Sequence, residues 1–254
     1  MAKPQRSGLT GYSKEERQQE QKNKNEKPME FEDEPQTSYI YKGDGQAQAD
    51  FFSENSNFNE LIESMSAREQ LDFSDVWVPG YFMFGDQYRG FENMRYDLQR
   101  ATRTFDKYLD QSVLRRSVVV HRLATAELVL GAGNKVGTLE ELQAMKGKTV
   151  ISIGNMSTGA GKHGLGIGST TSTKGGYSTK SCEYRITIPG GSKGAGMWIG
   201  DKRINSSFGR AQREFMMNRD IRLTVGNTTY DSKRDCYVVE LTYAGRLPHN
   251  YTHY

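Results

Sequence analysis

The stretch Glu183-Tyr-Arg-Ile-Thr-Ile-Pro-Gly-Gly-Ser-Lys-Gly-Ala-Gly-Met-Trp-Ile199 carries the clearest fold signal in the chain. Its first part, Tyr184–Ile188, alternates between side chains of different polarity, as expected for a strand with two different faces. The glycine-rich residues that follow predict a turn. Residues 196–199 then predict a second strand, so this stretch indicates sheet structure with glycine-rich connections.

Residues nearer the N-terminus show a helical pattern instead. Helices are predicted from Glu60 to Leu71 and from about Glu92 to Leu109, because apolar residues recur there every three or four positions. After Asp110 the period changes to two. Helices followed by strands, without βαβ alternation, predict an α+β domain whose sheet is mainly antiparallel. Further strands are expected at 118–120, 149–153, 214–217, 221–225 and 237–243, and a short helix at 140–145.

The first 48 residues are expected to form a disordered charged tail. Up to about Gln36 they are mainly Lys, Glu, Gln, Asn and Pro, which bury too little apolar surface to offset the entropy of ordering. Residues 49–254 are expected to form one domain, with a helical part at 49–113 and a sheet part at 114–254.

Composition excludes several classes of protein. No run of about 18 apolar residues occurs, so no membrane span is expected. The N-terminus lacks the apolar region of a secretory signal peptide, so we expect a cytoplasmic location, or delivery into a target cell by phage injection or specialised secretion. The net charge is only +3, without a basic stripe for nucleic acid. Cys182 and Cys236 lack the spacing of a disulfide framework or a zinc site and are expected to be small buried thiols.

An arginine, Arg122, stands where the apolar run Val118-Val-Val120 ends. A strand end is a rigid mount, and the planar guanidinium can grip a diphosphate through its fork of N–H donors. Taken alone, an arginine that simply reaches solvent explains the same position.

Five hydroxyl residues follow one another in Ser169-Thr-Thr-Ser-Thr173, beside several glycines. Small hydroxyl side chains allow a ligand to come close and offer hydrogen bonds at several heights. A hydroxyl-rich edge strand without a ligand is the alternative.

Gln212 and Glu214 precede the apolar residues Phe215-Met-Met217. Residues two apart on a strand face the same side, so the amide and the carboxylate are expected to point into one cleft. A carboxylate on a rigid strand is suited to stabilising positive charge that develops on a sugar. A polar edge facing solvent is the alternative.

Together and in this order, the three motifs resemble the Arg, Ser-Thr-Ser and Gln-x-Glu signature of ADP-ribosyltransferases. The stretch 183–199 also resembles that family's strand and Gly-Ser-Lys turn. The similarity covers about Leu114–Tyr243 and is greatest to bacterial Rho-modifying exoenzymes and related phage enzymes. It implies two packed, mainly antiparallel sheets behind a helical N-terminal lobe, with NAD in a cleft between the sheets.

The resemblance also implies a role for each NAD-binding residue. Arg122 matches the arginine that holds the NAD phosphates. Ser169, Thr170 and Thr171 match the Ser-Thr-Ser element, which shapes the nicotinamide pocket and helps to position the catalytic glutamate. Because the third position is threonine, Thr170-Thr171-Ser172 is an alternative register.

The remaining matches concern catalysis and the acceptor. Glu214 matches the catalytic glutamate, Gln212 the residue that orients the acceptor, and Phe208 the aromatic side chain that meets the target. The glutamine argues against an arginine acceptor, because a side-chain amide pairs well with another amide or with a base edge.

The implied activity is mono-ADP-ribosyl transfer: cleavage of the nicotinamide–ribose bond of NAD and transfer of ADP-ribose to a macromolecule, a protein rather than a nucleic acid. NAD is then the substrate and no metal is needed. Alternatives are an NAD glycohydrolase with water as acceptor, or a degenerate domain that serves as a binding or structural module, for example in a phage virion.

Two further sequence features are expected to carry no chemistry. The glycines from Gly159 to Gly168 do not match a phosphate-binding loop or a dinucleotide fingerprint, and we interpret them as a flexible loop. His249 and His253 lie in a C-terminal tail that we expect to be disordered.

Overall fold

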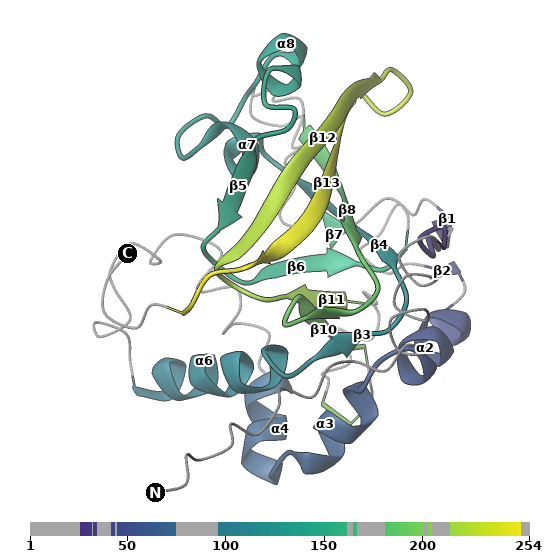
Figure 1. The fold of residues 1–254 in the computed structure, drawn as a ribbon, viewed down its shortest axis with the longest axis vertical. Helices are drawn as coiled ribbons and strands as arrows, with labels where there is room; N and C mark the ends of the chain where they lie inside the picture. Colours follow the sequence, from purple (N-terminus) through teal and green to yellow (C-terminus); the bar gives the residue numbers. More distant parts are fainter. Residues whose placement is uncertain are drawn as a thin grey trace, which may run out of the picture.

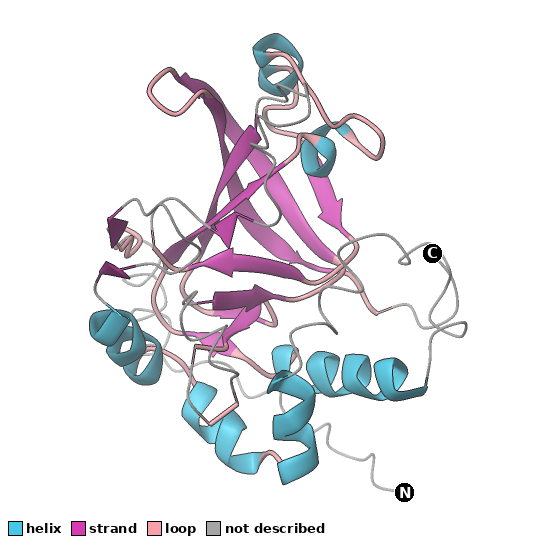
Figure 2. Ribbon diagram, turned by 180° about the vertical axis from the view of Figure 1, so that it is seen from behind, coloured by secondary structure: helices cyan, strands magenta, loops and turns pink. Residues whose placement is uncertain are grey.

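The computed structural model describes residues 26–31, 33–34, 42–43, 45–74, 96–161, 165–166, 181–200, 203–204 and 214–249. Figures 1 and 2 show helices α2, α3, α4 and α6 together at one end of a large sheet, with the short helices α7 and α8 at the opposite end. The bounds of the first group are α2 Gly45–Glu54, α3 Phe58–Ser64, α4 Ala67–Ser74 and α6 Tyr96–Leu109, and those of the second are α7 Glu127–Leu130 and α8 Leu139–Gln143.

Helix α6 confirms the predicted apolar face. Ala101, Phe105 and Leu109 are all buried at helical spacing, and the helix ends at Leu109. Its expected beginning at Glu92 lies outside the described residues.

The helix expected from Glu60 to Leu71 is two helices, so that prediction is wrong in its detail. The Ser66 hydroxyl accepts from the Glu69 backbone N–H (3.3 Å), and the Glu69 carboxylate accepts from the Ser66 backbone N–H (2.9 Å). This reciprocal capping box begins helix α4. Met65 just before it is extended, with ψ of 133°, and separates α3 from α4.

The larger strands are β4 Val118–Ala124, β5 Thr149–Ser152, β6 Met156–Gly159, β8 Ser181–Ile188, β10 Gly196–Trp198, β11 Glu214–Met217, β12 Ile221–Asp231 and β13 Cys236–Arg246. Two-residue strands complete the set: β1 Asp33–Glu34, β2 Lys42–Gly43, β3 Val113–Leu114, β7 Leu165–Gly166 and β9 Ser192–Lys193. The strands expected within the described residues are present, and β12 and β13 are longer than predicted. The strand expected at the hydroxyl residues 169–173 lies outside the described residues.

Within the described residues, the main sheet has the strand order β10-β11-β6-β4-β8-β13-β12-β5, with β7 beside β4. The β13–β8 and β4–β7 pairs are parallel and the other pairs are antiparallel, which confirms the α+β class and the mainly antiparallel sheet. A single residue pair, His121 with Gly159, joins β4 to β6. The two sheets implied by the resemblance are therefore two blocks of strands linked at one point, and Figure 1 shows β6, β10 and β11 running across the steep strands β8, β12 and β13.

Aromatic stacking fixes the helical end to the sheet. The ring of Phe52 on α2 stacks on Trp198 at 4.7 Å between centroids and lies 5.5 Å from the ring of Phe215. Gly196 makes this close packing possible. Its φ is +157°, and a Cβ there would come within 2.3 Å of the Met216 carbonyl oxygen.

The folded region begins earlier than the expected boundary at residue 49. Met29 pairs with Val118 and Phe31 with Gly161 as parallel bridges, and Phe31 is buried in the core. Residues 26–31, which we name the N-terminal strap, are therefore part of the domain, because Met29 and Phe31 supply apolar surface that packs on the core.

Two smaller expectations have clear outcomes. Cys182 and Cys236 are buried free thiols on the neighbouring strands β8 and β13, as expected.

His249 is ordered, contrary to the prediction, because its ring lies between the carboxylates of Asp110 and Asp220, at 2.9 and 3.1 Å. Among the described residues, no helix has the length and apolar character of a membrane span.

Candidate active site

Three neighbouring strands, β4, β6 and β11, bring distant parts of the chain together. Glu214 on β11 lies opposite Gly159 on β6, and Gly159 lies opposite His121 on β4. The sheet order thus places Glu214 and Arg122, the two predicted site residues that are described, on either side of one central strand. Arg122 lies inside β4 rather than at its end, because the strand continues beyond the apolar run to Ala124.

Glu214 is a carboxylate almost removed from water, with 1% of its surface exposed. The Ser157 hydroxyl donates a short hydrogen bond to Oε1. Among the described residues no donor reaches Oε2, although that atom is also buried. Such an unpartnered acceptor is costly unless a bound molecule supplies a donor. The hydroxyl of a ribose is a donor of the right kind.

Burial raises the pKa of Glu214 to about 7, while the hydrogen bond from Ser157 and the nearby charge of Arg122 act in the opposite direction. The carboxyl group therefore changes its charge near neutral pH. A buried carboxylate poised in this way is typical of a functional site.

Strand β6 is held firmly against β11. The hydroxyl of Thr158 donates to the Phe215 carbonyl oxygen at 2.6 Å, and all four residues of β6 are buried. Ser157 is therefore presented to Glu214 from a rigid position.

The guanidinium of Arg122 is partly buried and donates from Nη1 to the Ser157 carbonyl oxygen at 2.9 Å. Burial lowers its pKa to about 10, opposed by the nearby Tyr184 and Glu214, so it stays a cation at neutral pH. This is its single hydrogen bond to the described residues, and its remaining N–H groups suit a diphosphate.

The other predicted site residues, Ser169, Thr170, Thr171, Gln212 and Phe208, lie outside the described residues. Sequence reasoning missed Ser157. Its signal was the Ser157-Thr158 pair directly before the glycines that we interpreted as a loop, and β6 was missed with it.

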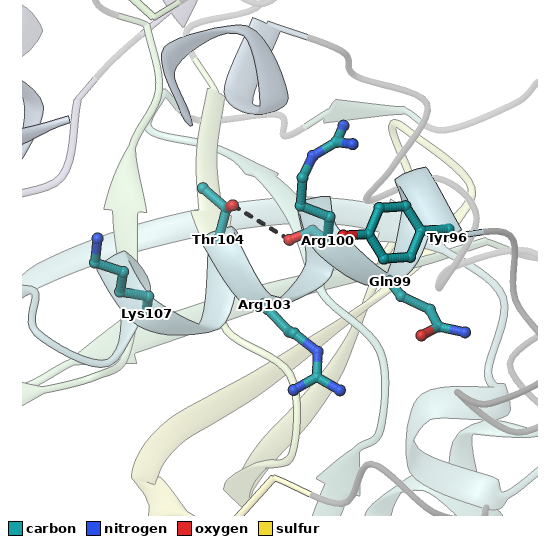
Figure 3. A pocket seen from close by; sticks show the side chains of 6 residues that line it. All are labelled: Tyr96, Gln99, Arg100, Arg103, Thr104 and Lys107. Atoms are coloured by element: carbon teal, nitrogen blue, oxygen red, sulfur yellow. Dashed lines mark hydrogen bonds between the residues drawn. The ribbon is translucent and has the colours of Figure 1, made fainter. Parts of the chain in front are cut away.

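A separate hollow of about 370 Å³ lies along α6 and is lined by Tyr96, Gln99, Arg100, Arg103, Thr104 and Lys107 (Figure 3). It contains no residue of β4, β6 or β11. Two of its cations are already engaged: Arg100 with Asp72 at 3.0 Å and Lys107 with Glu69 at 2.7 Å. The hollow is therefore distinct in its lining residues from the site on the sheet. The described part of the chain also contains no group of three His, Cys, Asp or Glu side chains placed to hold a metal ion.

Comparison with known proteins places the chain in a family. The family model described as ADP-ribosyltransferase exoenzyme matches residues 86–244. No curated protein matches the sequence.

Solved structures agree with the family match. C3stau2 from S. aureus with NAD is 13% identical, with a TM-score of 0.55 over 86% of this chain and 100% of that one. The C3 exoenzyme of Clostridium limosum is 12% identical, with a TM-score of 0.56 over 86% and 98%. Plx2a, an ADP-ribosyltransferase toxin from Paenibacillus larvae, is 15% identical, with a TM-score of 0.55 over 80% and 97%. At these identities the similarity shows a shared fold.

Because the family model spans more than half of the sequence, the chain belongs to the ADP-ribosyltransferase exoenzyme family. It is an NAD-dependent mono-ADP-ribosyltransferase, and NAD is its substrate. The resemblance to bacterial exoenzymes is confirmed for family and fold.

Proposed function

We propose that Glu214, Ser157 and Arg122 form the NAD-cleaving centre of this transferase. The observation that carries the proposal is the buried carboxylate of Glu214, with one oxygen held by the Ser157 hydroxyl and the other without a donor among the described residues. Arg122 supports it, because its cation lies close enough to lower the pKa of Glu214.

The reaction follows from this placement. The bond between ribose C1′ and the nicotinamide nitrogen breaks, and its electron pair leaves with nicotinamide, whose ring becomes neutral. Positive charge then develops on the ribose, where the ionised Glu214 stabilises it. The acceptor atom forms a new bond to C1′ and releases its proton. Arg122 holds the diphosphate, so that the ribose stays aligned during the transfer.

The remaining expected residues have roles in this proposal as well. Ser169, Thr170 and Thr171 shape the nicotinamide pocket, whereas Ser157 supplies the hydroxyl that positions Glu214. Gln212, two residues before Glu214, orients the acceptor, and Phe208 contacts it.

The acceptor in this proposal is a protein side chain with an amide group. The argument is chemical, because the amide of Gln212 both donates and accepts and so pairs with a second amide more readily than with a guanidinium. Transfer to nucleic acid and transfer to water are the competing outcomes.

A labelled-NAD experiment tests the centre and the acceptor together. Wild type and Glu214→Gln are each incubated with NAD labelled in the ADP-ribose part and with a whole-cell lysate, and label is measured on protein and on nucleic acid. We expect label on protein with the wild type alone. Label on nucleic acid would replace the protein acceptor, and nicotinamide release without transfer would make the protein a glycohydrolase.

Arg122→Lys tests the diphosphate contact. Lysine keeps the charge but loses the planar fork, so we expect the KM for NAD to rise about tenfold while kcat changes less. An unchanged KM would remove Arg122 from the binding site.

Gln212→Ala tests whether Gln212 acts on the acceptor and Glu214 on NAD. We expect transfer to the protein acceptor to be lost while NAD hydrolysis continues, because Glu214 and Arg122 remain in place. Equal loss of both activities would contradict a role confined to the acceptor.

A further inference from the structure

A second charged centre lies next to Arg122 in the sequence. The side chain of His121 has no exposed surface, and both of its ring nitrogens face carboxylates. Nδ1 lies 3.0 Å from Oε1 of Glu183 on β8. Nε2 lies 3.1 Å from Oε1 of Glu30 on the N-terminal strap, an ion-pair contact whose angle falls short of a straight hydrogen bond.

Each carboxylate is also bound by an arginine. Arg185 donates to both oxygens of Glu30 at 2.7 and 2.8 Å, and Glu240 lies 3.9 Å from Arg185. Arg234 makes a short contact with Glu183 and also donates to Asp231 at 2.7 Å. Among the described residues, these are the charged groups that face His121 and its two partners.

This geometry bears on how many of the two ring nitrogens of His121 carry a proton. A neutral imidazole has one N–H group and presents a lone pair at its other nitrogen. A lone pair on Nδ1 facing the buried carboxylate of Glu183, or on Nε2 within 3.1 Å of Glu30, is repelled by that carboxylate, so the geometry favours a proton on each nitrogen. The pKa directions agree. Burial opposes the charge of His121, but Glu183 and Glu30 raise its pKa, and His121 is the main cause that lowers the pKa of Glu30 to about 2.

The position of His121 connects this centre to the active site. His121 is the residue through which β4 pairs with β6. We call this pair of residues, His121 and Gly159, the joint of β4 and β6. Ser157 lies two residues before Gly159 on β6, and Arg122 follows His121 on β4. The strap lies along the same strand, where the Met29 N–H donates to the Ser117 carbonyl and the Val119 N–H donates to the Met29 carbonyl, both at 2.9 Å.

We propose that protonated His121 is a positioning residue, which ties the strap through Glu30 to the joint of β4 and β6 and so holds Arg122 and Ser157 in the arrangement that binds NAD. This inference rests on the proposed function, because it assumes that Arg122 contacts NAD. His121 itself touches no reacting atom. It acts by keeping the two strands in register behind the site.

The proposal has a direct pH consequence. His121 gains its partners on folding and is held in its charged form, so its contribution is complete at acidic pH and is lost as the pH rises through its raised pKa. The affinity for NAD should therefore fall on the alkaline side. Removing the charge of Glu30 lowers the pKa of His121 and moves this fall to lower pH.

Glu30→Gln and Glu26→Gln form a matched pair for the test. Both substitutions remove one carboxylate from the strap, but Glu26 pairs with the more exposed Arg116 at 3.1 Å and does not contact His121. For Glu30→Gln we expect the KM for NAD to rise about tenfold at pH values between the lowered pKa of His121 in the variant and its raised pKa in the wild type, as expected for the loss of an interaction with a charged group, with kcat changed less. Above the wild-type pKa of His121, the variant and the wild type should converge. Glu26→Gln should behave as the wild type.

The protonation of His121 is measured directly by the ¹⁵N chemical shifts of its ring in the wild type, which requires no activity. We expect both nitrogens to be protonated at neutral pH and the titration of the ring to coincide with the alkaline rise in KM. A neutral ring at neutral pH, or equal pH profiles for the two variants in a folded protein, would overturn the proposal.

Arg122→Lys separates this proposal from the proposed function. If Arg122→Lys raises the KM but Glu30→Gln does not, Arg122 contacts NAD and the positioning role of His121 is wrong. If Arg122→Lys has no effect, the assignment of the NAD site itself is wrong.

Discussion

Replacing Glu214 with glutamine should stabilise the folded protein at alkaline pH although it removes the activity. The side chain of glutamine has nearly the same shape and still accepts from Ser157, but it carries no charge. In the wild type, burial raises the pKa of Glu214 from 4.5 to about 7, so the folded state resists ionisation that the unfolded state permits. The ionised carboxylate therefore lowers the stability of the enzyme.

The magnitude follows from the difference between the two pKa values. Each pKa unit corresponds to about 1.4 kcal/mol, so ionised Glu214 costs the folded state about 3 kcal/mol when the pH is above both values. The cost disappears below the unfolded pKa, because the carboxyl group is then protonated in both states. Between about pH 5.5 and about pH 8 the stability of Glu214→Gln relative to the wild type should rise by about 2 kcal/mol.

Urea unfolding at a series of pH values measures this difference. The fluorescence of Trp198, which stacks on Phe52 in the core, reports on the folded state, and linear extrapolation gives the free energy of unfolding. Glu63→Gln is the control, because that side chain is 73% exposed and its loss should add no pH-dependent difference. A difference between Glu214→Gln and the wild type that stays constant with pH would refute the reasoning.

Three further predictions concern other buried groups. Ser157→Ala removes a hydrogen bond that lowers the pKa of Glu214, so the acid limb of the pH profile for NAD hydrolysis should move to higher pH; an unmoved limb would show that this contact does not control the carboxylate. Asp106→Asn breaks a fully buried pair with Arg219, joined by two hydrogen bonds of 2.9 Å, and should lower the free energy of unfolding by about 3 kcal/mol in urea titrations; a loss below about 1 kcal/mol would mean that other groups compensate. His249→Gln should destabilise the protein at acidic pH and much less at alkaline pH, because the raised pKa of His249 gives stability that is lost as the pH rises; thermal melts that show equal destabilisation at both ends would contradict this.

Periodic elements were predictable from the sequence alone. Strand β11 has the expected bounds, Glu214–Met217, because its buried residues form a short apolar run. Helix α6 has the expected apolar face, because a half-buried helix leaves a regular pattern of apolar residues. The strand positions of Arg122 and Glu214 were predictable for a similar reason, since each lies beside an apolar run that marks its strand. For these two elements the local pattern of apolar residues was sufficient.

Ser157 and the rest of β6 were not predictable in this way. The residues Met-Ser-Thr-Gly have weak strand propensity, and only the flanking strands β4 and β11 make them a central strand. His249 was missed because its order depends on Asp110 and Asp220, which are distant in the sequence. The break at Ser66 did have a local signal, the Ser-x-x-Glu capping box.

The proposed NAD-cleaving centre also depends on the order in which β4, β6 and β11 pair during folding. Arg122 and Ser157 are 35 residues apart in the sequence, and Ser157 and Glu214 are 57 apart. Contacts of this range form more slowly than a hairpin such as β12–β13, because a long loop must be closed first. A chain still leaving the ribosome cannot form the contact between Ser157 and Glu214 until β11 has emerged, so the proposed NAD-cleaving centre is incomplete up to that point. Because these strands are far apart in the sequence, the proposed centre can form only after most of the domain has been synthesised.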